Sequence, residues 1–98
     1  MSYNIEFTDS AVDDIRPFKK NEQILIIDGI SKQLQSEPLK AARNRKPLRP
    51  NDLSTWELRV DRFRIFYDVS EETKIVLIKA IGWKDHNALY IRGKEFLL

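Results

Sequence analysis

The sequence contains no cysteine, one histidine and only three glycines among its 98 residues. Without cysteine there is no disulfide framework, no thiolate zinc site and no thiol nucleophile, which fits a reducing compartment such as the cytoplasm. Three scattered glycines are too few for a phosphate-cradling loop or a dinucleotide fingerprint. A single histidine cannot form a metal site by itself, so we expect no metal and no cofactor.

Long apolar runs and a large net charge are also missing. No stretch approaches the length needed to span a bilayer, and residues 1–7 lack the basic and apolar regions of a secretion signal. The 17 Lys and Arg nearly balance the 15 Asp and Glu, and 42% of the residues are hydrophobic, so the chain should fold. We expect a single domain over residues 1–98, located in the cytoplasm, with no membrane contact.

Basic side chains gather in one segment. Residues 38–50 carry no acidic side chain and five basic ones: Lys40, Arg43, Arg45, Lys46 and Arg49. Such a segment attracts polyanions, although a solvated basic loop has the same composition. If the segment binds a polyanion, these five residues are candidate RNA contacts.

The spacing of apolar residues in the first third predicts one strand and two helices. Residues 3–8 alternate with the period of a half-buried strand. Asp9 or Ser10 can cap a short helix that Pro17 ends. Asn21 can cap a second helix, which runs to residue 36 and carries the stripe we expect to be buried: Ile24, Ile27, Ile30, Ser31 and Leu34.

The second half returns to the period of strands. Residues 55–60, 63–69 and 74–83 are three such runs, and the third is almost continuously apolar, as in a central strand. Residues 85–92 can form a short last helix with Asp85 as its cap and Gly93 as its stop. The predicted fold is α+β with the order β-α-α-β-β-β-α: a mostly antiparallel four-stranded sheet, two N-terminal helices packed on one face, and the other face open.

A two-residue turn at Asp61 and Arg62 would place Arg59 opposite Arg64, with Glu57 next along the same face. One interpretation is a surface network of two arginines and a glutamate. The other is a pair of guanidinium groups that binds a phosphate, with Phe66 beside it as a stacking surface for a base. A phenylalanine at the position of Phe66 is more often simply a core residue.

The histidine, His86, lies four residues before Tyr90, so on a helix the two side chains would share a face. His86 could carry a proton near neutral pH, although a lone surface histidine is the commoner case.

Three runs carry a resemblance to a known family: Trp56 to Val60 (WELRV), Phe63 to Val69 (FRIFYDV) and Ile75 to Gly82 (IVLIKAIG), followed by Lys84 and Tyr90. They resemble the RelE branch of the RelE/ParE toxins, and the likeness extends over essentially the whole chain. It implies the same element order, and it implies the toxin half of a toxin–antitoxin pair. RelE-type members are similar to small ribonucleases that cut mRNA in the ribosomal A site.

The resemblance also implies roles for residues. Arg64 matches the arginine that binds the scissile phosphate, and Arg59 fits a further basic position. Lys84 stands at a basic position after the last strand, and Tyr90 matches a tyrosine that stacks on or orients the attacked nucleotide. The family's two lysines, one of them a general base, align with Thr55 and Glu57, and this sequence has neither.

Cleavage of this kind needs a base for the 2′-OH, a cation for the phosphate and an acid for the leaving oxygen, without metal or cofactor. Arg64 with Arg59 can supply the cation, and Glu57 is the candidate base. His86 or Lys84 could be the acid, with Lys46 as a spare candidate. Because these groups are few, we expect activity to depend on the ribosome holding the mRNA in a reactive geometry.

The expected partners are a cognate antitoxin, the ribosome and mRNA, with operator DNA reached only through the antitoxin complex. Two alternatives stay open: a ParE-like inhibitor of DNA gyrase, and a catalytically inactive member that binds only its antitoxin. The fold permits all three functions.

Overall fold

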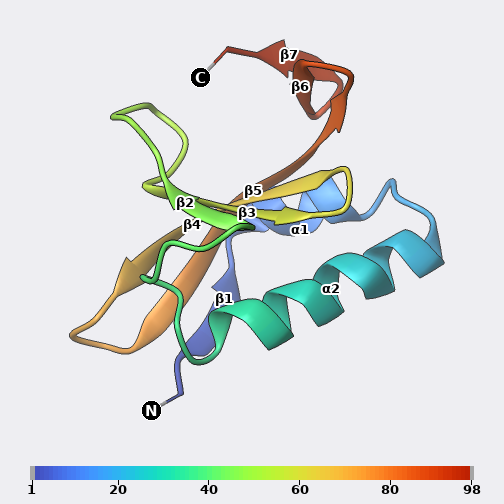
Figure 1. The fold of residues 1–98 in the computed structure, drawn as a ribbon. Helices are drawn as coiled ribbons and strands as arrows, with labels where there is room; N and C mark the ends of the chain where they lie inside the picture. The colour runs from blue at the N-terminus through green and yellow to red at the C-terminus, as the bar shows by residue number, and fades with distance from the viewer. Residues whose placement is uncertain (1, 98) are drawn as a thin grey trace.

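A computed structural model describes residues 2–97. Two helices pack against a seven-stranded, mostly antiparallel sheet (Figure 1). The elements in chain order are β1 (Asn4–Phe7), α1 (Asp9–Ile15), α2 (Lys20–Leu34), β2 (Arg45–Pro47), β3 (Trp56–Val60), β4 (Phe63–Ser70), β5 (Ile75–Asp85), β6 (Ala88–Ile91) and β7 (Lys94–Phe96). The α+β class is as predicted, but the sheet has seven strands where four were expected.

The two helices begin slightly earlier than the sequence suggested. The Thr8 hydroxyl, and not Asp9 or Ser10, caps α1 by accepting from the backbone N–H of Ala11. The first residue before α2 is Lys19, whose N–H donates to the Glu22 carboxylate at 3.1 Å, so Asn21 already lies inside the helix. The expected break at Pro17 is confirmed, since α1 ends at Ile15.

The buried face of α2 differs from the expected stripe. Ile26, Ile30 and Leu34 are buried, whereas Ile24 and Ile27 are 61% and 44% exposed. Gly29 sets this rotation, because a Cβ at that position would lie 2.7 Å from Cγ2 of Val60 on β3. The helix therefore packs closely on the sheet at Gly29 and turns part of its apolar surface outward.

The β3–β4 hairpin has the predicted register. Val60 pairs with Phe63 and Arg59 with Arg64 across a turn formed by Asp61 and Arg62. A bulge between Phe66 and Tyr67 follows, where β4 pairs with β5. The extra residue of this bulge lies on β5, so side chains on β4 alternate without interruption between the helix-covered face and the opposite face.

Two different strands pair with successive parts of the long strand β5. Its first half pairs in parallel with β1, and its end, from Trp83, pairs with β6. Between these two parts, the backbone groups of β5 that no strand pairs with are hydrogen-bonded by residues at α1. The Thr8 N–H donates to the Ile78 carbonyl at 3.0 Å, and the Asp14 carboxylate accepts from the Ile81 N–H at 3.0 Å. These contacts fix α1 on the sheet.

The predicted C-terminal helix over residues 85–92 is wrong, because the segment forms strands (Figure 1). His86 begins the turn after β5 with φ 57°, and the pair Arg92 and Gly93 turns the chain between β6 and β7 with φ values of 54° and 76°. Two consecutive positive φ values are typical of a two-residue hairpin turn, for which glycine is favoured. Gly93 thus closes a hairpin and does not end a helix.

Two apolar clusters lie on opposite faces of the sheet. The larger one joins the helices to Leu58, Phe63, Ile65 and Tyr67, among others. The smaller one consists of Phe66, Ala80, Leu89 and Ile91, with Leu48, Leu53 and Phe96 packed against it. The face predicted to be open is therefore partly covered by the C-terminal strands and by the segment around residues 48–53.

Candidate active site

Glu57 is the centre of a charged cluster on the sheet face opposite the helices. Only 7% of the residue is exposed, and its carboxylate lies between two cations. The Nε of Arg64 is 3.5 Å from Oε2, and the Nζ of Lys46 is 3.7 Å from Oε1. The strands position these groups, since Lys46 on β2 is the cross-strand partner of Glu57 on β3. The Arg64–Glu57 pair is the part of the predicted network of two arginines and a glutamate that forms, and Lys46 joins it. Among residues 2–97, Arg59 has no ion pair with Glu57 and lines the adjoining hollow.

The Arg64 guanidinium is held by the turn before it. Its Nη1 donates to the carbonyls of Asp61 and Phe63, both at 3.0 Å, and its side chain is 13% exposed. Asp61 adopts φ 55°, which turns the backbone beneath the guanidinium. Burial lowers the pKa of Arg64, and the neighbouring Glu57 carboxylate opposes that shift. Among residues 2–97, none accepts a hydrogen bond from Nη2, which leaves that group available for an anion.

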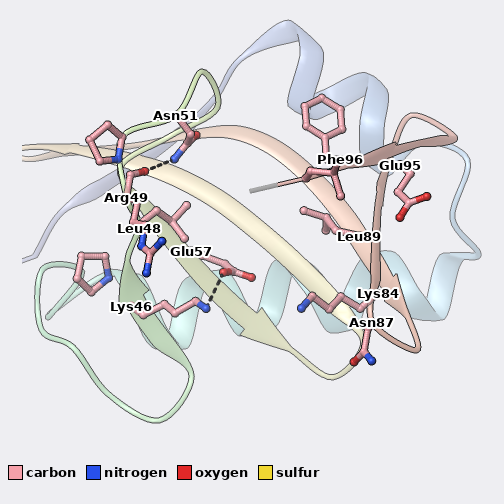
Figure 2. A pocket seen from close by; sticks show the side chains of 13 residues that line it. Lys46, Leu48, Arg49, Asn51, Glu57, Lys84, Asn87, Leu89, Glu95 and Phe96 are labelled. Carbon is pink, nitrogen blue, oxygen red and sulfur yellow. Dashed lines mark hydrogen bonds and ion pairs between the residues drawn. The ribbon is translucent and has the colours of Figure 1, made fainter.

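Two adjoining hollows open above the cluster, and they share Lys46, Glu57 and Lys84. The smaller, of about 250 Å³, is also lined by Arg43, Arg59 and Arg64. The larger, of about 470 Å³, lies between the basic segment and the C-terminal strands. Figure 2 shows Lys46 and Lys84 reaching toward one another from opposite sides of this hollow, with the Glu57 carboxylate between their strands.

The strand alternation explains how Lys84 reaches the cluster. Arg64 pairs with Gly82 on β5, so the side chain of Lys84, two residues on, points to the same face as Arg64. The smaller hollow thus gathers the positive side chains of four strands and of the loop before β2 around one carboxylate. Such a surface attracts and orients a polyanion.

The predicted basic contacts divide into two groups. Arg43, Lys46 and Arg49 line the hollows. Arg45 also lines the smaller hollow, but its guanidinium holds the fold together, because it donates to the carbonyls of Gln33 at 2.6 Å and Lys40 at 3.2 Å. Lys40 pairs with Glu37 at 3.4 Å and lines neither hollow.

Three further predicted site residues lie away from the cluster. Phe66 is fully buried in the smaller apolar cluster, so the prediction that it stacks on a base is wrong for this structure. Tyr90 stacks on Trp83, its cross-strand partner, with ring centroids 5.7 Å apart, on the face opposite Lys84. His86 lies in the turn after β5 with its side chain 95% exposed, so His86 and Tyr90 do not share a helix face.

Lys46 was predicted only as a spare candidate, and the structure places it beside Glu57. It belongs to a strand of three residues, which is too short for a periodic pattern to reveal. The available signal was its position in the basic segment. The residues that the C-terminal strands add to the larger hollow, such as Asn87, Leu89 and Phe96, were missed because that segment was assigned to a helix.

Among residues 2–97, no group of three or more histidine and acidic side chains is arranged to hold a metal ion. Within the same residues, neither helix has the length and apolar character required to cross a membrane.

The chain matches no protein-family model and no curated protein sequence. It is similar to a chain of the toxin–antitoxin complex RelBE2 from Mycobacterium tuberculosis, with a TM-score of 0.75 and 25% identity over 86% of this chain and 93% of that chain. It is also similar to a chain of the archaeal RelE–RelB complex from Pyrococcus horikoshii, with a TM-score of 0.63, 18% identity, and coverage of 80% and 90%. The second match concerns the fold alone.

Proposed function

We propose that the chain is a RelE-like toxin, the toxin of a toxin–antitoxin pair, and that it cuts mRNA on the ribosome without a metal ion. The cluster of Glu57, Arg64 and Lys46, joined by Lys84 at the shared hollows, carries this proposal. It combines a carboxylate that can accept the proton of the 2′-OH with a guanidinium that can bind the phosphate, and phosphodiester cleavage by a 2′-OH requires both functions.

The proposed roles follow from the contacts. Glu57 takes the proton of the attacking 2′-OH, since its carboxylate faces the hollow where the RNA backbone would lie. Arg64, anchored at Nη1 and open at Nη2, binds the phosphate and stabilises the charge that builds up on its oxygens. Lys84 or Lys46 protonates the leaving 5′-oxygen, and Arg59 adds a further cation.

The two lysines of the family pattern are absent at positions 55 and 57, and two lysines from other strands can take their place. Lys46 from β2 and Lys84 from β5 line the same hollows as Glu57. Two ammonium groups therefore line the hollow at Glu57, one from β2, which pairs with β3, and one from β5, on the far side of β4. One carboxylate among the six cationic side chains of the smaller hollow still leaves its surface positive, so it can bind a phosphate.

The antitoxin is the proposed protein partner. The matched structures are complexes of a toxin with its antitoxin. A flexible antitoxin segment that folds on binding would mask Arg59 and Arg64. Co-expression with the adjacent open reading frame should recover a tight complex, and recovery of no partner would count against this part of the proposal. Operator DNA would be bound only through that complex.

The chemistry can be tested by measuring mRNA cleavage in a purified translation reaction. We expect Arg64→Ala and Glu57→Gln each to slow mRNA cleavage by about 100-fold or more, because each removes a group needed in the transition state. Arg62→Ala is the matched control: Arg62 is adjacent in the turn but points to α2, where it pairs with Glu22 at 2.8 Å. Equal loss in Arg62→Ala, or full activity in Glu57→Gln, would refute the assigned roles.

A further inference from the structure

The outward side of α2 carries an apolar stripe that the proposed function does not use. Ile24 and Ile27 are 61% and 44% exposed, and Lys20 and Ser31 continue the same line along the helix. A shallow groove follows these residues, with Asp28 beside it. In Figure 1, α2 lies along one face of the sheet, and the candidate site lies on the opposite face.

The spacing of the stripe is that of a helix–helix contact. Residues 20, 24, 27 and 31 are separated by four, three and four positions, which is the alternation of the core positions in a coiled coil. The inner side of the helix is already satisfied by the sheet through Ile26, Ile30 and Leu34. The stripe is therefore a second, unoccupied packing surface of the same helix.

We propose that this stripe is a self-association surface, on which α2 of a second copy of the chain packs antiparallel. A two-fold axis between Ile24 and Ile27 places Ile24 on the partner's Ile27 and Ile27 on the partner's Ile24. The same operation places Lys20 beside the partner's Ser31 and Asp28, at both ends of the contact. Such a contact is isologous, as in most homodimers.

The distribution of charge favours the antiparallel arrangement. Lys20 lies on the stripe at the N-terminal end of α2, and Asp28 lies beside the stripe in its second half, so a reversed copy brings these two opposite charges together. Lys32 in the last turn is paired with Asp28 of its own helix. A parallel copy would place Lys20 against Lys20. Asp28 also has an exposed ion pair with Lys32 at 3.0 Å within its own helix, which leaves its second oxygen free for the partner's Lys20. The antiparallel helix dipoles add to the same preference.

The size of the surface predicts a weak dimer. One flank of a four-turn helix offers less than the roughly 800 Å² per partner of a standard stable interface. The association should therefore depend on protein concentration. It leaves Arg64 and Glu57 uncovered and does not depend on the proposed nuclease activity.

Sedimentation equilibrium across about 10 µM to 1 mM tests the dimer, with Arg64→Ala as the background so that the full chain can be produced without toxicity. We expect Ile27→Glu to raise the dimer dissociation constant at least 10-fold. Leu25→Glu is the matched control, since Leu25 is 43% exposed on the same helix but lies off the stripe, and it should change the constant less than 3-fold. A monomer at every concentration, or equal effects of both variants, would overturn the proposal.

The antiparallel register has an independent test, because the chain contains no cysteine. A mixture of Lys20→Cys and Ser31→Cys chains should form a disulfide-linked heterodimer on mild oxidation. Either variant alone should not, because its two thiols would be separated by about 16 Å along the helix axis, beyond the reach of a disulfide. Cross-linking of each variant with itself and not with the other would overturn the antiparallel contact, as would no cross-linking at all.

Discussion

Asp14 offers the clearest link between one side chain and the stability of the fold. Its side chain is fully buried and connects three parts of the chain. Oδ2 accepts from the Ile81 N–H at 3.0 Å, at the point of β5 where neither β1 nor β6 provides a partner. Oδ1 pairs with Nε of Arg92 at 2.7 Å, which ties the turn between β6 and β7 to α1.

Asp14→Ala removes both contacts. Leaving the buried Ile81 N–H without an acceptor costs about 1–3 kcal/mol. The ion pair adds about 0.5 kcal/mol, since the Arg92 side chain is 45% exposed and returns to water. Relief of the desolvation of the carboxylate offsets part of this loss. We expect a decrease of about 2 kcal/mol in the free energy of unfolding, or about 8–16 °C in the melting temperature of a domain of this size.

Urea and thermal unfolding of three variants separate the contributions. Asp14→Asn keeps an acceptor for the Ile81 N–H and should lose less than about 1 kcal/mol. Asp13→Ala is the control on the same helix, because Asp13 is 69% exposed and pairs only with exposed Arg16, so it should change stability by less than about 0.5 kcal/mol. The reasoning fails if Asp14→Ala is no less stable than Asp14→Asn.

Three further predictions concern the pH dependence of Asp14 and substitutions at Gly82 and Tyr67. Burial raises the pKa of Asp14 above its ordinary value of 3.8, so the folded protein binds this proton more tightly than the unfolded chain and loses stability as pH rises above about 4. Asp14→Asn does not titrate, so it should gain stability relative to the wild type as pH rises above about 4 in urea titrations, and a difference that does not change with pH would contradict this. Gly82→Ala should cost more than about 2 kcal/mol, because its Cβ would lie 2.3 Å from the Tyr90 carbonyl oxygen; unchanged near-ultraviolet circular dichroism and stability would contradict this. Tyr67→Phe should cost about 1 kcal/mol in denaturant unfolding, since it leaves the buried Pro38 carbonyl, now 2.7 Å from the Tyr67 hydroxyl, without its donor, and a neutral result would place water there.

Strong periodicity predicted the centre of the fold well. The two-residue turn at Asp61 and Arg62, and the pairing of Arg59 with Arg64, followed from alternation alone and are confirmed. The same alternation placed Glu57 beside the arginines. These residues lie in strands long enough for a pattern of period two to be unambiguous.

The errors lie where a short segment allowed two interpretations. Residues 85–96 contain strands of only three and four residues, and Gly93 suits a hairpin turn as well as a helix end. On α2, both Ile24 and Ile26 fit an apolar face, and only the close approach of Gly29 to Val60 decides between them. That approach is a tertiary contact, which sequence spacing does not contain.

The residues of the site were predicted less completely than their strands. Arg64 and Glu57 were identified through the hairpin, but Lys46 joins them from a strand distant in sequence. Phe66 was assigned to the site face correctly, yet its burial depends on the C-terminal strands that cover it. Both features arise from how separate segments meet, which is the part of a site that local patterns describe least.

The most direct test of the proposed function is primer extension on mRNA in a purified translation reaction, with and without ribosomes. The account predicts new mRNA ends with the wild-type chain only when ribosomes are present, and none with Arg64→Ala. Intact mRNA with the wild type, or equal cleavage by Arg64→Ala, would contradict the central claim that the cluster around Arg64 and Glu57 cuts ribosome-bound mRNA.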